Sequence, residues 1–149
     1  MKRFKFVFTI LLLYVLVIPS ANCFAQKYLG NLSANRFDFN STSNPFGKGS
    51  SFNYNSINNQ FGKYGSPFSN SSVNNPFATN APKLYDSQGN YRGKLSSNPF
   101  DPDSISNSFG RYGSKFSPDS IKNEFGAGSP FKHDSPNNPF GKGLTIIGE

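Results

Sequence analysis

The sequence predicts a loop-rich tandem-repeat protein with short helical turns and a minor β-hairpin. Its composition also allows part of the chain to be disordered. Three observations predict this class. A segment of 50 residues occurs twice, at residues 28–77 and 91–140, which are 63 positions apart. A ten-residue unit recurs six times inside these two blocks, three times in each. Residues 26–149 also hold only 24 Phe, Leu, Ile and Val among 124 residues, which is near the level at which chains fail to fold alone.

The first 25 residues have the layout of a cleavable secretory signal peptide. Three basic residues among the first five precede an apolar run at residues 6–18, and small residues then place the cut between Ala25 and Gln26. The run of 13 residues is shorter than the roughly 20 that a membrane-spanning helix needs. We therefore expect a secreted, periplasmic or cell-surface protein with no transmembrane segment after cleavage.

Cys23 leaves one alternative for this leader, because a lipoprotein signal acylates such a cysteine. Ser20 and Asn22 fit that signal poorly, since it prefers a Leu-like residue three positions before the cysteine and a small residue just before it. Cys23 is also the single cysteine of the chain. Residues 26–149 can therefore form neither a disulfide nor a thiolate zinc site.

The repeated unit is Phe-x-x-[Asp/Asn/Ser]-Ser-x-x-Asn-x-Phe. Its starting positions are spaced by 15 or 16 residues, and the one longer step, 32 residues, equals two periods of 16. The six copies carry twelve repeated phenylalanines: Phe37, Phe46, Phe52, Phe61, Phe68, Phe77, Phe100, Phe109, Phe116, Phe125, Phe131 and Phe140. This regular phase predicts an array in which neighbouring units support each other.

Each unit is predicted to form one or two helical turns, followed by a Gly-rich turn. In residues 117–123, Ser117 is a good N-cap, Pro118 suits the first helical position and Asp119 suits the first turn. Asn and Gly follow within a few residues, and both tolerate left-handed backbone. Because so short a helix is not stable alone, we expect Phe and Ile side chains to pack on neighbouring units.

The segments outside the two blocks are predicted to form β-structure. Residues 78–90 are a linker that contains the first arm of a hairpin, and its second arm follows at residues 91–95 after a Gly-containing turn. Residues 28–32 match that second arm. The C-terminal tail, residues 141–149, holds a further β-like stretch. These pieces together predict a small sheet.

Residues 61–68, with the sequence Phe-Gly-Lys-Tyr-Gly-Ser-Pro-Phe, and residues 138–141, with Asn-Pro-Phe-Gly, resemble a group of small bacterial proteins. These proteins carry tandem YGSxY, Ser and NxYG blocks and are often secreted. The resemblance covers most of residues 28–141, with Phe here at many places where Tyr stands there. It implies a bacterial protein and brings no established activity.

No arrangement of residues in the chain is typical of a catalytic or metal site, so we expect no enzyme activity and no cofactor. His133 is the only histidine and occupies a variable position of the unit. Asp103, Asp119 and Asp134 share one unit position with Asn and Ser in the other copies, and all three residue types cap turns. The repeated serines lack a second histidine that could act as base.

Charge and aromatic content also limit the binding partners. Without the three basic residues of the leader, 12 basic residues face 8 acidic ones, and the net charge of +4 is spread along the chain. Because this charge is weak and forms no stripe, we expect no nucleic-acid partner. Asn-Pro-Phe occurs four times, but Asn-Pro is an ordinary turn starter.

The predicted function is that of an exported structural or interaction protein of unknown ligand, which acts through repeated aromatic, Asn and Ser units. Self-association of the units is one mode. The alternative is a module that binds envelope polysaccharide through Tyr64, Tyr112 and their Phe neighbours, because aromatic rings stack on sugar faces. Tyr64 and Tyr112 are its candidate ligand-binding residues.

Overall fold

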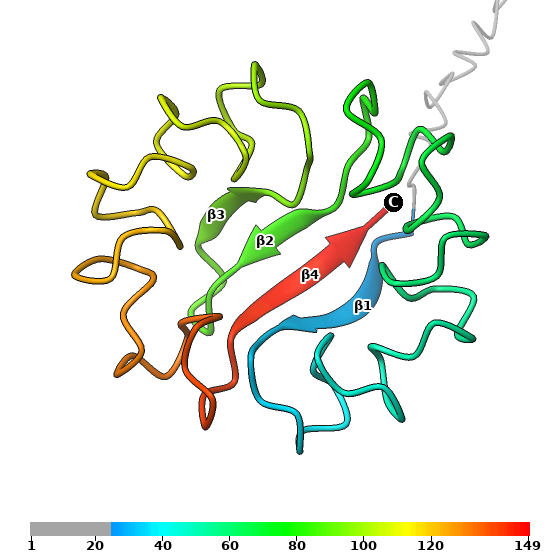
Figure 1. Cartoon of the computed structure of the whole chain (residues 1–149), viewed down its shortest axis with the longest axis horizontal. Helices are drawn as coiled ribbons and strands as arrows, with labels where there is room; N and C mark the ends of the chain where they lie inside the picture. Colours follow the sequence, from blue (N-terminus) through cyan, green and yellow to red (C-terminus); the bar gives the residue numbers. More distant parts are fainter. Residues whose placement is uncertain (1–24) are drawn as a thin grey trace, which may run out of the picture.

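The computed structural model describes residues 25–149. It contains four β-strands, β1 (Lys27–Leu32), β2 (Lys83–Tyr85), β3 (Tyr91–Lys94) and β4 (Leu144–Gly148). They form one antiparallel sheet in the order β1-β4-β2-β3, which crosses the middle of the molecule (Figure 1). The predicted fold class is wrong, because no helix occurs between residues 25 and 149 and this small sheet is the centre of the fold.

The sheet joins two similar halves. The first half comprises β1, the first repeat block and β2; the second comprises β3, the second block and β4. Each outer strand pairs with the central strand of the other half, so exchanging the halves leaves the strand order unchanged. At the centre, Leu84 of β2 lies opposite Ile146 of β4. The first block lies beside β1 and the second beside β3 (Figure 1).

The β-segments lie where the sequence places them. β2 and β3 pair as an antiparallel hairpin around a turn that contains Gly89, whose φ of +80° suits glycine. The outer strands each contain a glycine with positive φ, Gly30 at +124° and Gly93 at +96°. A Cβ at Gly30 would lie within 3 Å of Lys48, and one at Gly93 would lie within 3 Å of Tyr112. These glycines therefore allow the repeat blocks to approach the sheet edges.

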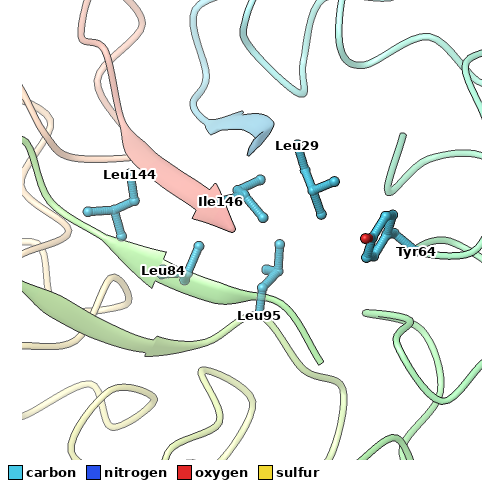
Figure 2. Packing of buried hydrophobic residues seen from close by; sticks show 6 residues of the cluster. All are labelled: Leu29, Tyr64, Leu84, Leu95, Leu144 and Ile146. Carbon is cyan, nitrogen blue, oxygen red and sulfur yellow. The ribbon is translucent and has the colours of Figure 1, made fainter. Parts of the chain in front are cut away.

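The hydrophobic core is small and comes mainly from the strands. Leu29, Leu84, Leu144 and Ile146 are buried in the sheet, and Leu95 and Tyr64 complete the cluster. Figure 2 shows Tyr64 at one end of this cluster, beyond Leu29. Partly buried side chains from the repeat units also pack against it: Ile57, Val73, Ile105 and Ile121.

The repeat blocks are chains of linked turns rather than helices. About every third residue donates its backbone N–H to the carbonyl three positions earlier, or four positions earlier once in each block. These bonds follow one another without a break over residues 38–72 in the first block and residues 101–141 in the second. Ser, Asn, Asp or Gly occupies nearly all of these positions. Five three-residue turns give the 15-residue spacing of the units, and one four-residue turn in each block, which contains Tyr64 or Tyr112, gives the spacing of 16.

Side-chain hydrogen bonds explain why the predicted helical turns do not form. The serine of each unit accepts, at its Oγ, the backbone N–H two residues later, at 3.0–3.2 Å. The asparagine of each unit donates its Nδ2 to the carbonyl six residues earlier, at 3.0–3.2 Å. These side chains offer the backbone a turn geometry in place of helical hydrogen bonds.

The repeated unit buries its serine and exposes its phenylalanines, which is the reverse of the expected pattern of burial. The six repeated serines are fully buried, and the twelve repeated phenylalanines are exposed. The expectation that Phe packs on neighbouring units is therefore wrong, because serine occupies the buried position of each unit while the strands supply most of the core. The partly buried isoleucines do pack against that core.

The predicted signal peptide and the alternative lipidation at Cys23 concern residues 1–25, which lie outside the described range except for Ala25. Between residues 25 and 149, no helix is long and apolar enough to cross a membrane.

Candidate interaction surface

The twelve repeated phenylalanines form the candidate site, which we call the exposed phenylalanine set. Each of their side chains is 85–99% exposed to solvent. Phe39 and Tyr54 are also exposed, at 64% and 67%, but lie outside the repeated positions. Large exposed apolar surfaces are uncommon on soluble proteins that do not bind anything. The set is therefore the feature of the described chain that most needs a functional explanation.

Every phenylalanine of the set is held by the same local hydrogen bond. Its backbone N–H donates to the side-chain oxygen of an Asn or Ser two residues earlier, at 2.9–3.4 Å. Such side-chain-to-backbone bonds define a tight turn. The twelve aromatic rings consequently leave the backbone from equivalent, fixed corners rather than from flexible loops.

The repeated asparagine binds at both ends of its amide. In the first unit, Asn44 accepts the N–H of Phe46 at 2.9 Å and donates to the carbonyl of Asp38 at 3.2 Å. In all four Asn-Pro-Phe sequences, the Asn side-chain oxygen likewise accepts the N–H of the Phe. One asparagine side chain thus holds the backbone of the last phenylalanine of the unit and also binds the carbonyl near the start of the same unit.

Three basic residues of the repeat blocks are directed at tyrosine rings. The Nζ of Lys48 lies 5.6 Å from the ring centre of Tyr28, and the Nζ of Lys63 lies 5.2 Å from that of Tyr64. The guanidinium of Arg111 lies 5.5 Å from the ring of Tyr112. These are cation–π distances. The three cations therefore contact tyrosine rings of the scaffold.

The two tyrosines predicted to bind a ligand are part of the interior. Tyr64 is 2% exposed, and its hydroxyl donates to the backbone carbonyl of Glu149 at 3.1 Å. Tyr112 is 7% exposed and packs edge-to-face on Tyr91, with ring centres 5.5 Å apart. Neither ring presents a face to solvent, so the predicted ligand-binding role of both is corrected to a packing role.

The aspartates of the second block form ion pairs and turn contacts. Arg92 bridges Asp86 and Asp119, at 2.8 and 2.9 Å, and Lys94 pairs with Asp101 at 2.9 Å. Burial alone would raise the pKa of Asp101, but the hydrogen bond from Lys94 helps to hold that pKa below its usual range. No group of three or more potential metal ligands occurs within residues 25–149.

Comparison with protein-family models, with curated proteins and with solved structures finds no match for this chain.

The spacing of Asn, Ser and Phe in the sequence indicates the exposed positions, although the residue type of Phe does not. Phenylalanine is usually assigned to a core, but each repeated Phe stands two residues after an Asn or Ser. That spacing is typical of a side-chain-capped turn. Together with turn-forming residues at every third position, it indicates that the Phe side chains lie on turn corners.

Proposed function

We propose that this is an exported structural or interaction protein, which associates through the exposed phenylalanine set with other copies of itself. The observation that carries the proposal is the exposure of all twelve side chains at equivalent turn corners. Burying one such side chain contributes about 2 kcal/mol. Contact between several of these side chains and another apolar surface is therefore favourable.

The repetition favours contacts made by several rings at once. Association costs about 4–15 kcal/mol in lost translational and rotational freedom. One phenylalanine at about 2 kcal/mol cannot offset that cost, whereas several rings engaged together can. A second copy of the chain offers a matching series of rings. Because the corners are held by hydrogen bonds, little further ordering is needed on contact.

The alternative of envelope polysaccharide binding is less well supported. Of the aromatic residues predicted to bind the sugar, Tyr64 and Tyr112 are buried, which leaves their exposed Phe neighbours. The repeated phenylalanines lack polar atoms in their side chains, and sugar recognition requires polar groups that fix the orientation of the ligand. Association between apolar surfaces makes fuller use of the exposed set.

Sedimentation velocity over a range of protein concentrations tests the proposal. We expect the wild type to show concentration-dependent association. A variant with Phe46→Ser and Phe61→Ser should need at least about five-fold higher concentration for the same degree of association, which corresponds to about 1 kcal/mol.

The matched control carries Phe39→Ser and Tyr54→Ser, which also removes two exposed aromatic side chains but leaves the repeated set intact. This control should associate like the wild type. A wild type that stays monomeric at millimolar concentration would contradict the proposal, as would equal effects of the two double variants.

A further inference from the structure

A cavity of about 430 Å³ lies in the second half, between its last two repeat units and the sheet. Pro118, Ala127 and Leu144 provide its apolar lining. The rest of the lining is polar or charged and includes Asp86, Arg92, Asp119, Lys132, His133 and Asp134. The volume lies in the range of cavities that hold small molecules.

The equivalent place in the first half is filled by a tyrosine. Tyr64 immediately precedes Gly65, as Ala127 immediately precedes Gly128 in the matching connection of the second half. The turn that contains Tyr64 has four residues, closed by the N–H of Ser66 on the carbonyl of Gly62. The matching turn has three residues and no tyrosine. The second half therefore lacks the aromatic ring that occupies this place in the first.

The surroundings of Tyr64 show what such a ring contacts. A Cβ built on Gly148 would lie 2.5 Å from the Tyr64 ring and 3.0 Å from Leu29, so all three residues are closely packed. The Tyr64 hydroxyl donates to the carbonyl of Glu149 at 3.1 Å. A phenolic ring in this place thus meets an apolar surface along its side and an oxygen acceptor at its tip.

The second half offers an acceptor at the corresponding tip. Ser87 lies three positions after Leu84, as Glu149 lies three positions after Ile146, and Leu84 and Ile146 are opposite each other in the sheet. The Oγ of Ser87 donates to Oδ2 of Asp134 at 2.6 Å. Asp134 also lines the cavity, so its carboxylate is the acceptor at this tip.

We propose that this cavity binds a phenolic ring, either a small free phenol or the side chain of a tyrosine in a peptide. The ring would lie against Pro118, Ala127 and Leu144, and its hydroxyl would donate to the carboxylate of Asp134, which lines the cavity. Arg92 is held by its carboxylate partners Asp86 and Asp119, so its guanidinium forms a fixed wall. This site is independent of the exposed phenylalanine set.

Titration followed by NMR tests the proposal on purified protein expressed from the full-length sequence. The probes are p-cresol, which has the structure of a tyrosine side chain, and toluene, which lacks the hydroxyl. We expect p-cresol to bind with a dissociation constant of about 0.1–1 mM and toluene at least ten-fold more weakly. Equal binding of the two probes, or no binding of p-cresol at 10 mM, roughly ten times the weakest expected constant, would overturn the proposal.

N-acetyltyrosinamide distinguishes the two sources of the ring. Binding of this probe as tightly as p-cresol assigns a peptide tyrosine, and binding of p-cresol alone assigns a free phenol. Both outcomes support a phenol site, and failure of both probes overturns it.

Two variants locate the site. Replacing Ala127 by a Lys-Tyr pair, as at positions 63–64, should fill the cavity and abolish p-cresol binding, while Asp134→Ala should weaken it at least ten-fold. The backbone spectrum away from the site shows whether each variant is folded. Unchanged p-cresol binding in either folded variant would overturn the assignment.

Discussion

The two halves of the molecule share a backbone plan but differ in what lies beneath the repeat units. In the first half, Leu29 and Tyr64 fill the space beside the end of β4 with apolar groups. In the second half, the corresponding strand carries Arg92, which pairs with Asp86 and Asp119. The linked turns are held by their own Ser and Asn side chains in both halves. The hydrogen-bonded turns therefore form above apolar side chains in one half and above charged side chains in the other.

The largest effect is expected from removing the aromatic filling of the first half. Tyr64→Ala should lower the free energy of unfolding by about 3–5 kcal/mol, because it leaves a cavity where a large ring was buried. Urea unfolding followed by circular dichroism measures this loss. Phe61→Ser, three residues away and exposed, is the matched control and should change stability by less than about 0.5 kcal/mol. A loss below about 1 kcal/mol for Tyr64→Ala would show that the first half, like the second, tolerates a cavity beneath its turns.

The second half should instead respond to acid through Asp86. Burial alone would raise the pKa of this carboxyl, but hydrogen bonds from Asn90 and Arg92 outweigh burial and hold the pKa below its usual range. The folded-state pKa is therefore lower than the unfolded-state value of 3.8. It follows that Asp86 stabilises the fold above that value, and that this contribution is lost as the pH falls through the folded-state pKa.

Asp86→Asn tests this dependence. At pH 7 the variant should be about 2 kcal/mol less stable than the wild type, because charge-assisted hydrogen bonds are lost. The difference should shrink as the pH falls below 3.8. Asp38→Asn, which changes an exposed turn contact in the first half, should cost less than about 0.5 kcal/mol. A difference between Asp86→Asn and the wild type that stays constant down to pH 2, roughly two units below the unfolded-state pKa, would contradict this account.

The sheet could be predicted from the sequence because its signals are local. Lys83–Tyr85 and Tyr91–Lys94 flank a turn with Gly89, and such pairs of short segments predict a hairpin. The β-like stretch of the tail becomes β4. The strand order could not be predicted in this way, because insertion of β4 between β1 and β2 depends on contacts between distant segments.

The turns and the site could not be predicted from residue types alone. Ser117, Pro118 and Asp119 favour a helix start, but Ser and Asp cap β-turns equally well. The deciding feature is the repetition of such residues at every third position, which a helix period of 3.6 does not match. Hydrophobicity alone places phenylalanine in the core, whereas the structure buries the repeated serine and exposes the repeated phenylalanines. Residue type likewise suggests a ligand for Tyr64, although this ring completes the core.

The smallest effect, and the most direct test of a common scaffold, concerns the buried serines. Ser56 in the first half and Ser120 in the second each accept one backbone N–H at 3.1 Å and are almost completely buried. Ser56→Ala and Ser120→Ala should each lower the free energy of unfolding by about 1 kcal/mol, because each leaves one N–H without its acceptor. Urea unfolding of both variants should give the same loss within about 0.5 kcal/mol. Clearly unequal losses would mean that the packing beneath the turns, apolar in one half and charged in the other, helps to hold them, so that the two halves would not share an autonomous scaffold.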